Sequence, residues 1–149
     1  MDFLNIQDFF KVIRPEELED VVGEYTEPTD EGAVILDSLE LDAISEMVGY
    51  LSVRYDATKC FATTDEEANA IPRIPIIIQK CVDIVLYNAY SAVHPNNIPE
   101  LRKIRYENAV NWLEKTAIGF IAPDLPVKDE QPTTPLRYNS SQKKQNNFF

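Results

Sequence analysis

The chain has 149 residues, of which 44% are hydrophobic and 26% are charged, and this composition fits one globular domain with one modest core. The net charge of −11 comes from the first part: residues 1–56 hold 15 acids and 3 bases, whereas residues 57–149 hold 10 acids and 11 bases. Such a field repels phosphates, which argues against a nucleic-acid reader. It favours a protein that must not stick to DNA, or one that docks on a basic partner.

The first helical segment is expected over residues 14–25, "RPEELEDVVGEY". Pro15 suits the first position of a helix, acids follow it in the first turn, and Leu18, Val21 and Val22 share one face. The acidic stretch Thr26–Ala33 contains proline and glycine and is expected to be a loop. A second helix is predicted over residues 36–56, because apolar residues recur there three and four positions apart.

The third predicted helix starts at Pro75 and runs to residue 92. It is apolar almost all round, which indicates the central and most buried helix. The connection before it, residues 57–73, is expected to hold at most a short helix around Asp65–Ala70. Pro99 opens a fourth helix that ends near Gly119, a residue suited to a C-terminal cap. No alternating apolar and polar pattern, which would indicate a strand, continues over more than a few residues. The sequence therefore predicts an all-α fold, a small bundle of about four helices.

This helical domain is expected to span residues 1–122, followed by a long extended tail over residues 123–149. Four prolines keep the tail extended, and its polar composition gives it no core of its own. Its last stretch, Arg137–Phe149, is polar and ends in two phenylalanines. The tail is either a disordered end or a segment that becomes ordered only on a partner.

The first ten residues carry acids where a signal peptide needs a positive region, and the longest apolar run, "IPIII", is far too short to span a membrane. We therefore expect no membrane partner and synthesis in a cytoplasm. Cys60 and Cys81 have no metal-ligand spacing and are interpreted as reduced, at least half-buried thiols.

Catalytic, cofactor and metal sites find no support in the sequence, so we expect a protein that is not an enzyme. The one histidine, His94, lies in a turn with no nucleophile motif around it. Asp83, inside the apolar third helix, is the one acid expected to be buried. Its partner would be Arg54, Arg102 or Arg105, in a structural ion pair.

The fourth helix places arginines and an aromatic residue off its main apolar stripe. Arg102, Arg105 and Trp112 are therefore candidates for packing against a neighbouring copy. For Trp112 a place in the core is the alternative.

Three stretches together resemble a known family: "AISEMVGYLSVRY", "IPIIIQKCVDIVLYNAY" and "IPELRKIRYENAVNWLEKTAIGFI". In order and spacing they are similar to the Mu-like phage neck proteins, long catalogued as a domain of unknown function and related in architecture to head-completion adaptors. The resemblance covers residues 36–122 and the end of the tail. The first twenty residues and the long linker 56–73 depart from the family's pattern. The resemblance therefore predicts the three-helix core better than it predicts how the first helix packs.

The resemblance implies a structural virion protein of the phage neck, made in the bacterial cytoplasm, that joins head to tail. It implies a homo-oligomeric ring of about twelve copies beneath the portal protein, by analogy with the portal's cyclic symmetry. DNA would pass through the ring without specific binding. A tail-terminator or other neck or tail protein would be a further partner of the ring. The tail, with Arg137, Tyr138, Phe148 and Phe149, would dock on a partner.

Two alternatives remain open at this point. The first is a small acidic helical adaptor that binds one protein partner. The second is a tail-terminator or stopper protein of the phage neck, although such proteins usually contain more β-structure.

Overall fold

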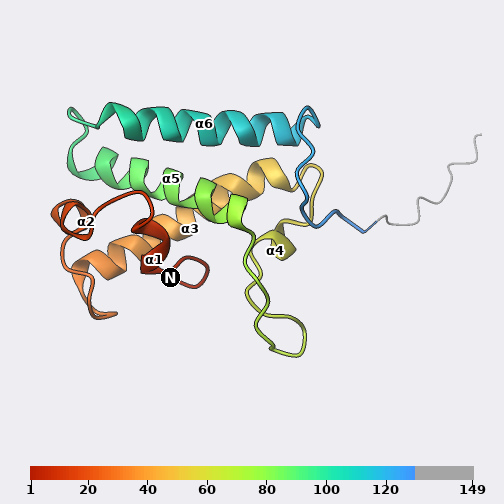
Figure 1. Cartoon of the computed structure of the whole chain (residues 1–149), viewed down its shortest axis with the longest axis horizontal. Coiled ribbons are helices and arrows are strands. Elements are labelled where there is room, and N and C mark those ends of the chain that lie inside the picture. Colours follow the sequence, from red (N-terminus) through yellow and green to blue (C-terminus); the bar gives the residue numbers. More distant parts are fainter. Residues whose placement is uncertain (130–149) are drawn as a thin grey trace, which may run out of the picture.

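A computed structural model describes residues 1–129, and this part of the chain contains six helices and no strand (Figure 1). The all-α prediction is confirmed, and the four predicted helices are all present. The helices are α1 (Ile6–Phe9), α2 (Pro15–Val22), α3 (Glu31–Leu51), α4 (Ala57–Cys60), α5 (Pro75–Val93) and α6 (Glu100–Ala117).

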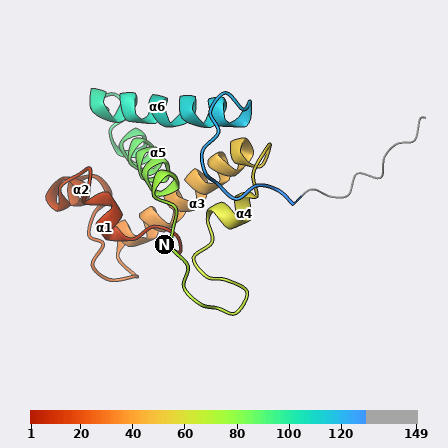
Figure 2. The ribbon, with the colours of Figure 1, turned by 45° about the vertical axis from the view of Figure 1, so that its right-hand side comes forward.

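Helix α5 is the centre of the body, as its composition predicts. It packs against α1, α2, α3 and α6, while α3 and α6 also contact each other (Figures 1 and 2). By length and composition α5 is the one described helix that could cross a membrane, a test that core helices also pass, and 56% of its apolar window is buried inside the body. Its buried side chains are Ile77, Ile78, Cys81, Val82, Asp83, Ile84, Val85, Leu86, Ala89 and Tyr90.

The N-terminal segment before α2 closes one side of the core. Helix α1, which the sequence analysis missed, begins with a capping box in which Asn5 caps the backbone of the first turn and Asp8 accepts from the Asn5 amide. Upstream of it, the carboxylate of Glu40 accepts the backbone N–H groups of Phe3 and Leu4 at 3.0 and 2.9 Å. Glu40 is only 2% exposed, so this carboxylate fastens the N-terminal segment to α3.

Helix α3 begins at Glu31, five residues before the predicted start, inside the stretch expected to be a loop. Gly32 is buried there, and a Cβ at its position would lie 2.5 Å from the carbonyl oxygen of Gly23. The Gly32 N–H also donates to the Glu24 carbonyl oxygen at 2.8 Å. Glycine is therefore required by close backbone packing at this point, and it does not interrupt the helix.

The short helix expected around Asp65–Ala70 is absent, and that prediction is wrong. The chain forms helix α4 earlier, and residues 63–71 make a narrow loop closed by a bridge between Thr64 and Ala70. Asp65 accepts the backbone N–H groups of Glu67 and Asn69, an arrangement that competes with helix formation.

The chain after α6 turns back along the body. Gly119, at φ +80°, follows the last turn of α6, which confirms its expected role as a cap. Leu125 is 6% exposed, and the Asp56 N–H donates to the Pro126 carbonyl oxygen at 2.9 Å. Residues beyond the expected boundary at 122 thus pack on the domain as far as Val127, which pairs with Tyr55. The tail prediction for residues 130–149 lies outside the described residues.

Candidate interaction surfaces

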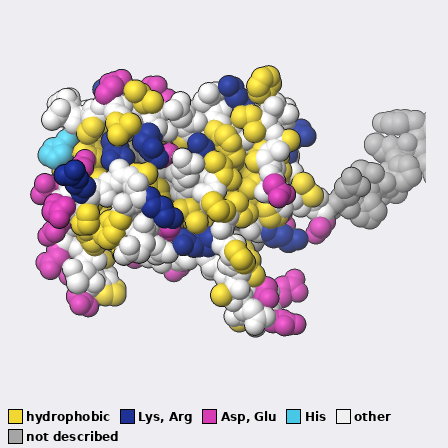
Figure 3. Space-filling model, in the orientation of Figure 1, with side chains coloured by type: hydrophobic (Ala, Val, Ile, Leu, Met, Phe, Trp, Pro, Cys, Tyr) yellow, Lys and Arg dark blue, Asp and Glu magenta, His cyan; other side chains and the backbone are white. Residues whose placement is uncertain are grey.

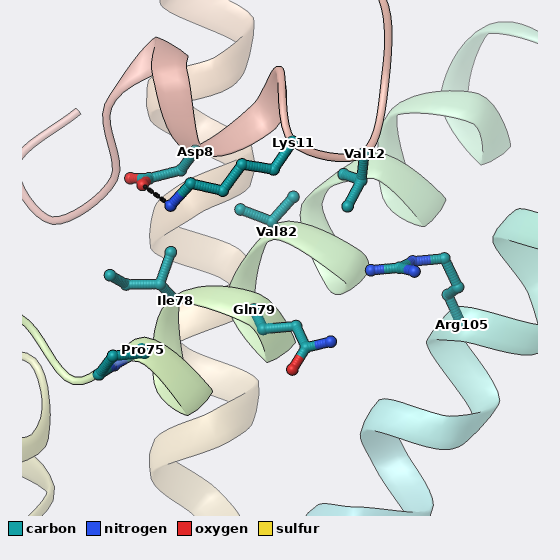
Figure 4. Close-up of a pocket in the computed structure, with 8 residues that line it drawn as sticks. All are labelled: Asp8, Lys11, Val12, Pro75, Ile78, Gln79, Val82 and Arg105. Carbon is teal, nitrogen blue, oxygen red and sulfur yellow. Dashed lines mark hydrogen bonds and ion pairs between the residues drawn. The ribbon is translucent and has the colours of Figure 1, made fainter.

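A groove of about 330 Å³ opens between the N-terminal segment, α5 and α6 (Figure 4). We call it the central groove. Its floor is apolar, because Ile78 and Val82 are buried beneath it, and Gln79 is exposed at its edge. The groove is lined by Asp8, Lys11, Val12, Pro75, Ile78, Gln79, Val82 and Arg105.

Cations enter the central groove from two different elements. Lys11 follows α1 and reaches Oδ1 of Asp8 at 3.3 Å, with 68% of its side chain exposed. Arg105 extends into the groove from α6, as Figure 4 shows. The same groove therefore presents an apolar floor between two positively charged side chains.

Asp8 is the acid of the groove, and it is already neutralised. Burial raises the pKa of its carboxyl, but hydrogen bonds from Arg73, the Asn5 amide and Lys11 outweigh burial, and the pKa is lowered overall. Arg73 also donates to the Phe3 carbonyl oxygen at 3.0 Å. These bonds hold Asp8 in its charged form, as part of the structure.

Arg105 makes the ion pair that the sequence predicted for Asp83. Its Nε donates to Oδ1 of Asp83 at 2.7 Å, so Arg105 is the partner among the three candidate arginines. Burial raises the pKa of Asp83, and the ion pair offsets this only in part. Asp83 is not the only buried acid, which corrects the prediction: Asp8 and Glu40 are 3% and 2% exposed.

A second hollow lies on the other side of Lys11 and Val12, with a volume of about 490 Å³. We call it the flanking hollow. Arg102, 5% exposed, donates from Nη2 to the Val12 carbonyl oxygen at 2.8 Å, while its Nη1 is buried without a partner in the described part of the chain. The flanking hollow is lined by Phe10, Lys11, Val12, Ile13, Arg14, Pro15, Glu17, Leu101 and Arg102.

The predicted contact residues of α6 do not form one patch. Arg102 is buried, Arg105 lines the central groove, and Trp112 is half-buried with Lys80 Nζ 5.8 Å from its ring centre. Their role in packing against a neighbour stays a prediction. The tail candidates Arg137, Tyr138, Phe148 and Phe149 lie outside the described residues.

The loop of residues 63–71 projects from the body beside the start of α5, and its tip is acidic (Figures 1 and 3). We call it the acidic finger. Asp65 organises it: the Asp65 N–H donates to the Asn69 carbonyl oxygen at 2.9 Å, and the Asn69 side-chain amide donates to the Asp65 carboxylate at 3.0 Å. Glu66 and Glu67 are exposed. Sequence reasoning missed this element, although Asp and Asn side chains that bond nearby backbone groups are a known turn signal, and Asp65 and Asn69 are both present here.

Exposed apolar side chains follow the C-terminal end of α6 in the chain. Ile118 and Phe120 are 75% and 77% exposed, and Val127, further along, is 65% exposed. We call Ile118 and Phe120 the end patch. Large exposed apolar surfaces mark contacts with other proteins more often than they mark free surface.

Residues 1–129 hold no group of three or more His, Cys, Asp or Glu side chains that could bind a metal ion. Cys60 and Cys81, at 1% and 0% exposure, are both buried. Burial, together with Asp56, raises the pKa of Cys60 to about 11, and burial also raises that of Cys81. Both thiols are therefore poor nucleophiles in the folded protein.

A family model described as "Bacteriophage Mu, Gp36" matches residues 3–141, nearly the whole chain. No curated protein and no solved structure matches the chain.

Proposed function

The chain belongs to the bacteriophage Mu Gp36 family, which indicates a structural protein of a Mu-like phage, and we propose that it forms an adaptor ring in the phage neck. The ring binds the portal protein, surrounds the channel through which DNA passes, and joins the head to the tail. The chain is made in the host cytoplasm and becomes part of the virion.

The family match over residues 3–141 is the observation that carries this proposal. It includes the N-terminal segment and the linker, where the sequence departs from the pattern of the neck proteins. The described body also suits a building block: one core forms around α5, and candidate contact surfaces lie around it. Cyclic rings need two different, complementary surfaces on each subunit, and the body offers more than one candidate.

The end patch is the candidate surface for the portal or the next neck protein. Ile118 and Phe120 are more exposed than apolar side chains of this size usually are, and burying them on a partner is favourable by about 1.5–3 kcal/mol each. The net charge of −11 supports the proposed passage of DNA through the ring, because an acidic ring does not retain DNA phosphates.

A second candidate function is a small acidic adaptor that binds one basic protein. The concentration of acids in residues 1–56 favours it. A tail-terminator or stopper is the nearest alternative within the phage neck. The number of copies bound to the portal distinguishes the two functions: an adaptor ring has many copies, whereas a small adaptor binds its partner one to one.

Native mass spectrometry of the chain, alone and with the portal protein from the same gene neighbourhood, tests the proposal. A closed ring of the chain on the portal is the expected result. Saturation at one copy per partner would favour the small adaptor, and absence of any complex with the portal would contradict the neck assignment.

A matched pair of variants locates the portal contact. Ile118→Ser combined with Phe120→Ser removes the apolar character of the end patch and should weaken portal binding. Leu41→Ser is the control, because Leu41 is 66% exposed and lies within α3, a different helix from α6. Equal loss, or no loss, in both variants would exclude the end patch from the contact.

A further inference from the structure

The central groove and the flanking hollow are locally basic in an acidic protein. Their lining residues include four cations, Lys11, Arg14, Arg102 and Arg105, and two acids, while the chain carries a net charge of −11. Figure 3 shows Lys and Arg side chains across the middle of this face and acids mostly toward its edges. A surface of this kind attracts an anionic partner.

Both acids in these hollows are already engaged within the chain. Asp8 is held by Arg73 at its Oδ2 and by Lys11 at its Oδ1, and Oε1 of Glu17 accepts from the Tyr90 hydroxyl at 2.7 Å. The cations of the central groove are only partly engaged. Lys11 pairs with Asp8 but remains 68% exposed, and Arg105 donates to Asp83 through its Nε while its guanidinium extends into the groove (Figure 4). These two side chains therefore offer the groove donors that suit a carboxylate.

The acidic finger supplies carboxylates in a pre-arranged form. Its base is closed by the bridge between Thr64 and Ala70 and by the Ile71 N–H donating to the Thr63 carbonyl oxygen at 3.0 Å. Its tip is held by Asp65, which leaves Glu66 and Glu67 exposed. A loop that is ordered before binding loses less conformational entropy when it docks.

The finger does not fill the groove of its own copy. It projects away from the body at the start of α5 (Figures 1 and 2), and none of its residues lines either hollow. The apolar floor at Ile78 and the cations on either side of it are therefore open to a loop from another molecule.

We propose that the acidic finger of one copy binds in the central groove of the next copy. The contact is heterologous, because finger and groove are different surfaces, so it can repeat from copy to copy and close into a ring. This inference rests on the proposed adaptor ring for its biological setting. Electrostatic attraction gives the contact its specificity and its sensitivity to salt.

Disulfide trapping tests the contact directly. Glu66→Cys places a thiol on the finger, and Gln79→Cys places one at the exposed edge of the groove. The two variants are mixed under mild oxidation at low salt, alone and on the portal. The control pair is Glu66→Cys with Ser45→Cys, an exposed position on α3 outside the groove. The native Cys60 and Cys81 are buried and do not compete.

We expect a several-fold higher yield of cross-linked dimer from the groove pair than from the control pair, and a fall in this excess as salt is raised. Equal yields from both pairs, alone and on the portal, would overturn the contact. A cross-link from the finger to the portal in place of the groove would also overturn it. If a wild-type ring forms on the portal but the groove pair gives no cross-link, the finger contact is wrong and the adaptor function stands. If the groove pair cross-links but no ring forms, the finger contact stands and the adaptor function is wrong.

Discussion

Arg105 on α6 and Asp83 on α5 form an ion pair, with Nε 2.7 Å from Oδ1. The pair is asymmetric: the Asp83 side chain is 4% exposed and the Arg105 side chain 27%. Removal of the arginine leaves a buried carboxylate alone, whereas removal of the acid leaves an arginine that can turn toward water.

This asymmetry predicts different costs for the two single substitutions. Arg105→Met should lower the free energy of unfolding by about 3 kcal/mol, and Asp83→Leu by clearly less. The double variant should regain much of the loss, because it contains neither charge. Urea unfolding of the four proteins gives the coupling free energy, and additive effects would show that the pair contributes nothing specific.

Glu40 predicts a second stability effect, at the N-terminal segment. Glu40→Gln replaces an acceptor that holds the amides of Phe3 and Leu4, and we expect a loss of about 2–3 kcal/mol. Hydrogen exchange at these two amides should become much faster. Asp42→Asn, at an exposed position on the same helix, is the control and should change neither quantity. Unchanged exchange in Glu40→Gln would contradict the role of this carboxylate.

The two glycines of α3 should respond in opposite ways to alanine. A Cβ at Gly32 would meet backbone oxygens at 2.5 and 2.6 Å, so Gly32→Ala should cost about 3 kcal/mol. Nothing lies within 4 Å of a Cβ at Gly49, so Gly49→Ala should stabilise the protein by about 0.5–1 kcal/mol through the entropy of the unfolded chain. Thermal unfolding of both variants measures this, and effects of the same sign would disprove the packing argument.

Asp8 predicts a dependence of stability on pH. Since its pKa is lower in the folded state than its ordinary value of 3.8, its contribution is present above that value and is lost as pH falls through the folded pKa. Asp8→Asn should cost about 1–3 kcal/mol near neutral pH, and the difference from wild type should shrink in acid. Asp20→Asn, exposed on α2, should show no such trend. A constant difference at all pH values would contradict the lowered pKa.

The buried thiols predict slow labelling of the native protein. Because burial, with Asp56, raises the pKa of Cys60 to about 11 and that of Cys81 is raised as well, few thiolates exist near neutral pH. Reaction with a thiol reagent should therefore be slow without denaturant and should accelerate as urea opens the structure. Rapid stoichiometric labelling in native buffer would contradict the burial of both cysteines.

The long helices could be predicted because their signals are local. Pro15 and Pro75 occupy the first positions of α2 and α5, and the apolar residues of α3 and α5 repeat at helical spacing over many turns. Helix α1 was missed because four residues give too short a period. Its signal was the capping pair Asn5 and Asp8, which a search for capping boxes would have found.

The errors came from residues whose type alone does not reveal which backbone or side-chain groups they bond or pack against. Gly32 looks like a helix breaker in the sequence, yet it allows α3 to pass close to the backbone after α2. The acids after Thr64 look like a helix start, but the side chain of Asp65 binds the backbone of the finger. The sequence offered three arginines to Asp83, and only the packing of α6 against α5 selects Arg105.

Because α5 lies at the centre of the body, substitutions in α5 and substitutions in the acidic finger should be tolerated to different degrees. This helix contacts α1, α2, α3 and α6, so a change in its volume disturbs four neighbours at once. Glu66 and Glu67 at the tip of the acidic finger are exposed, so the tip can vary while the packing of the body is kept. Among related phages we therefore expect the α5 core to diverge slowly and the finger to diverge quickly, so that new assembly partners are accommodated without a new fold.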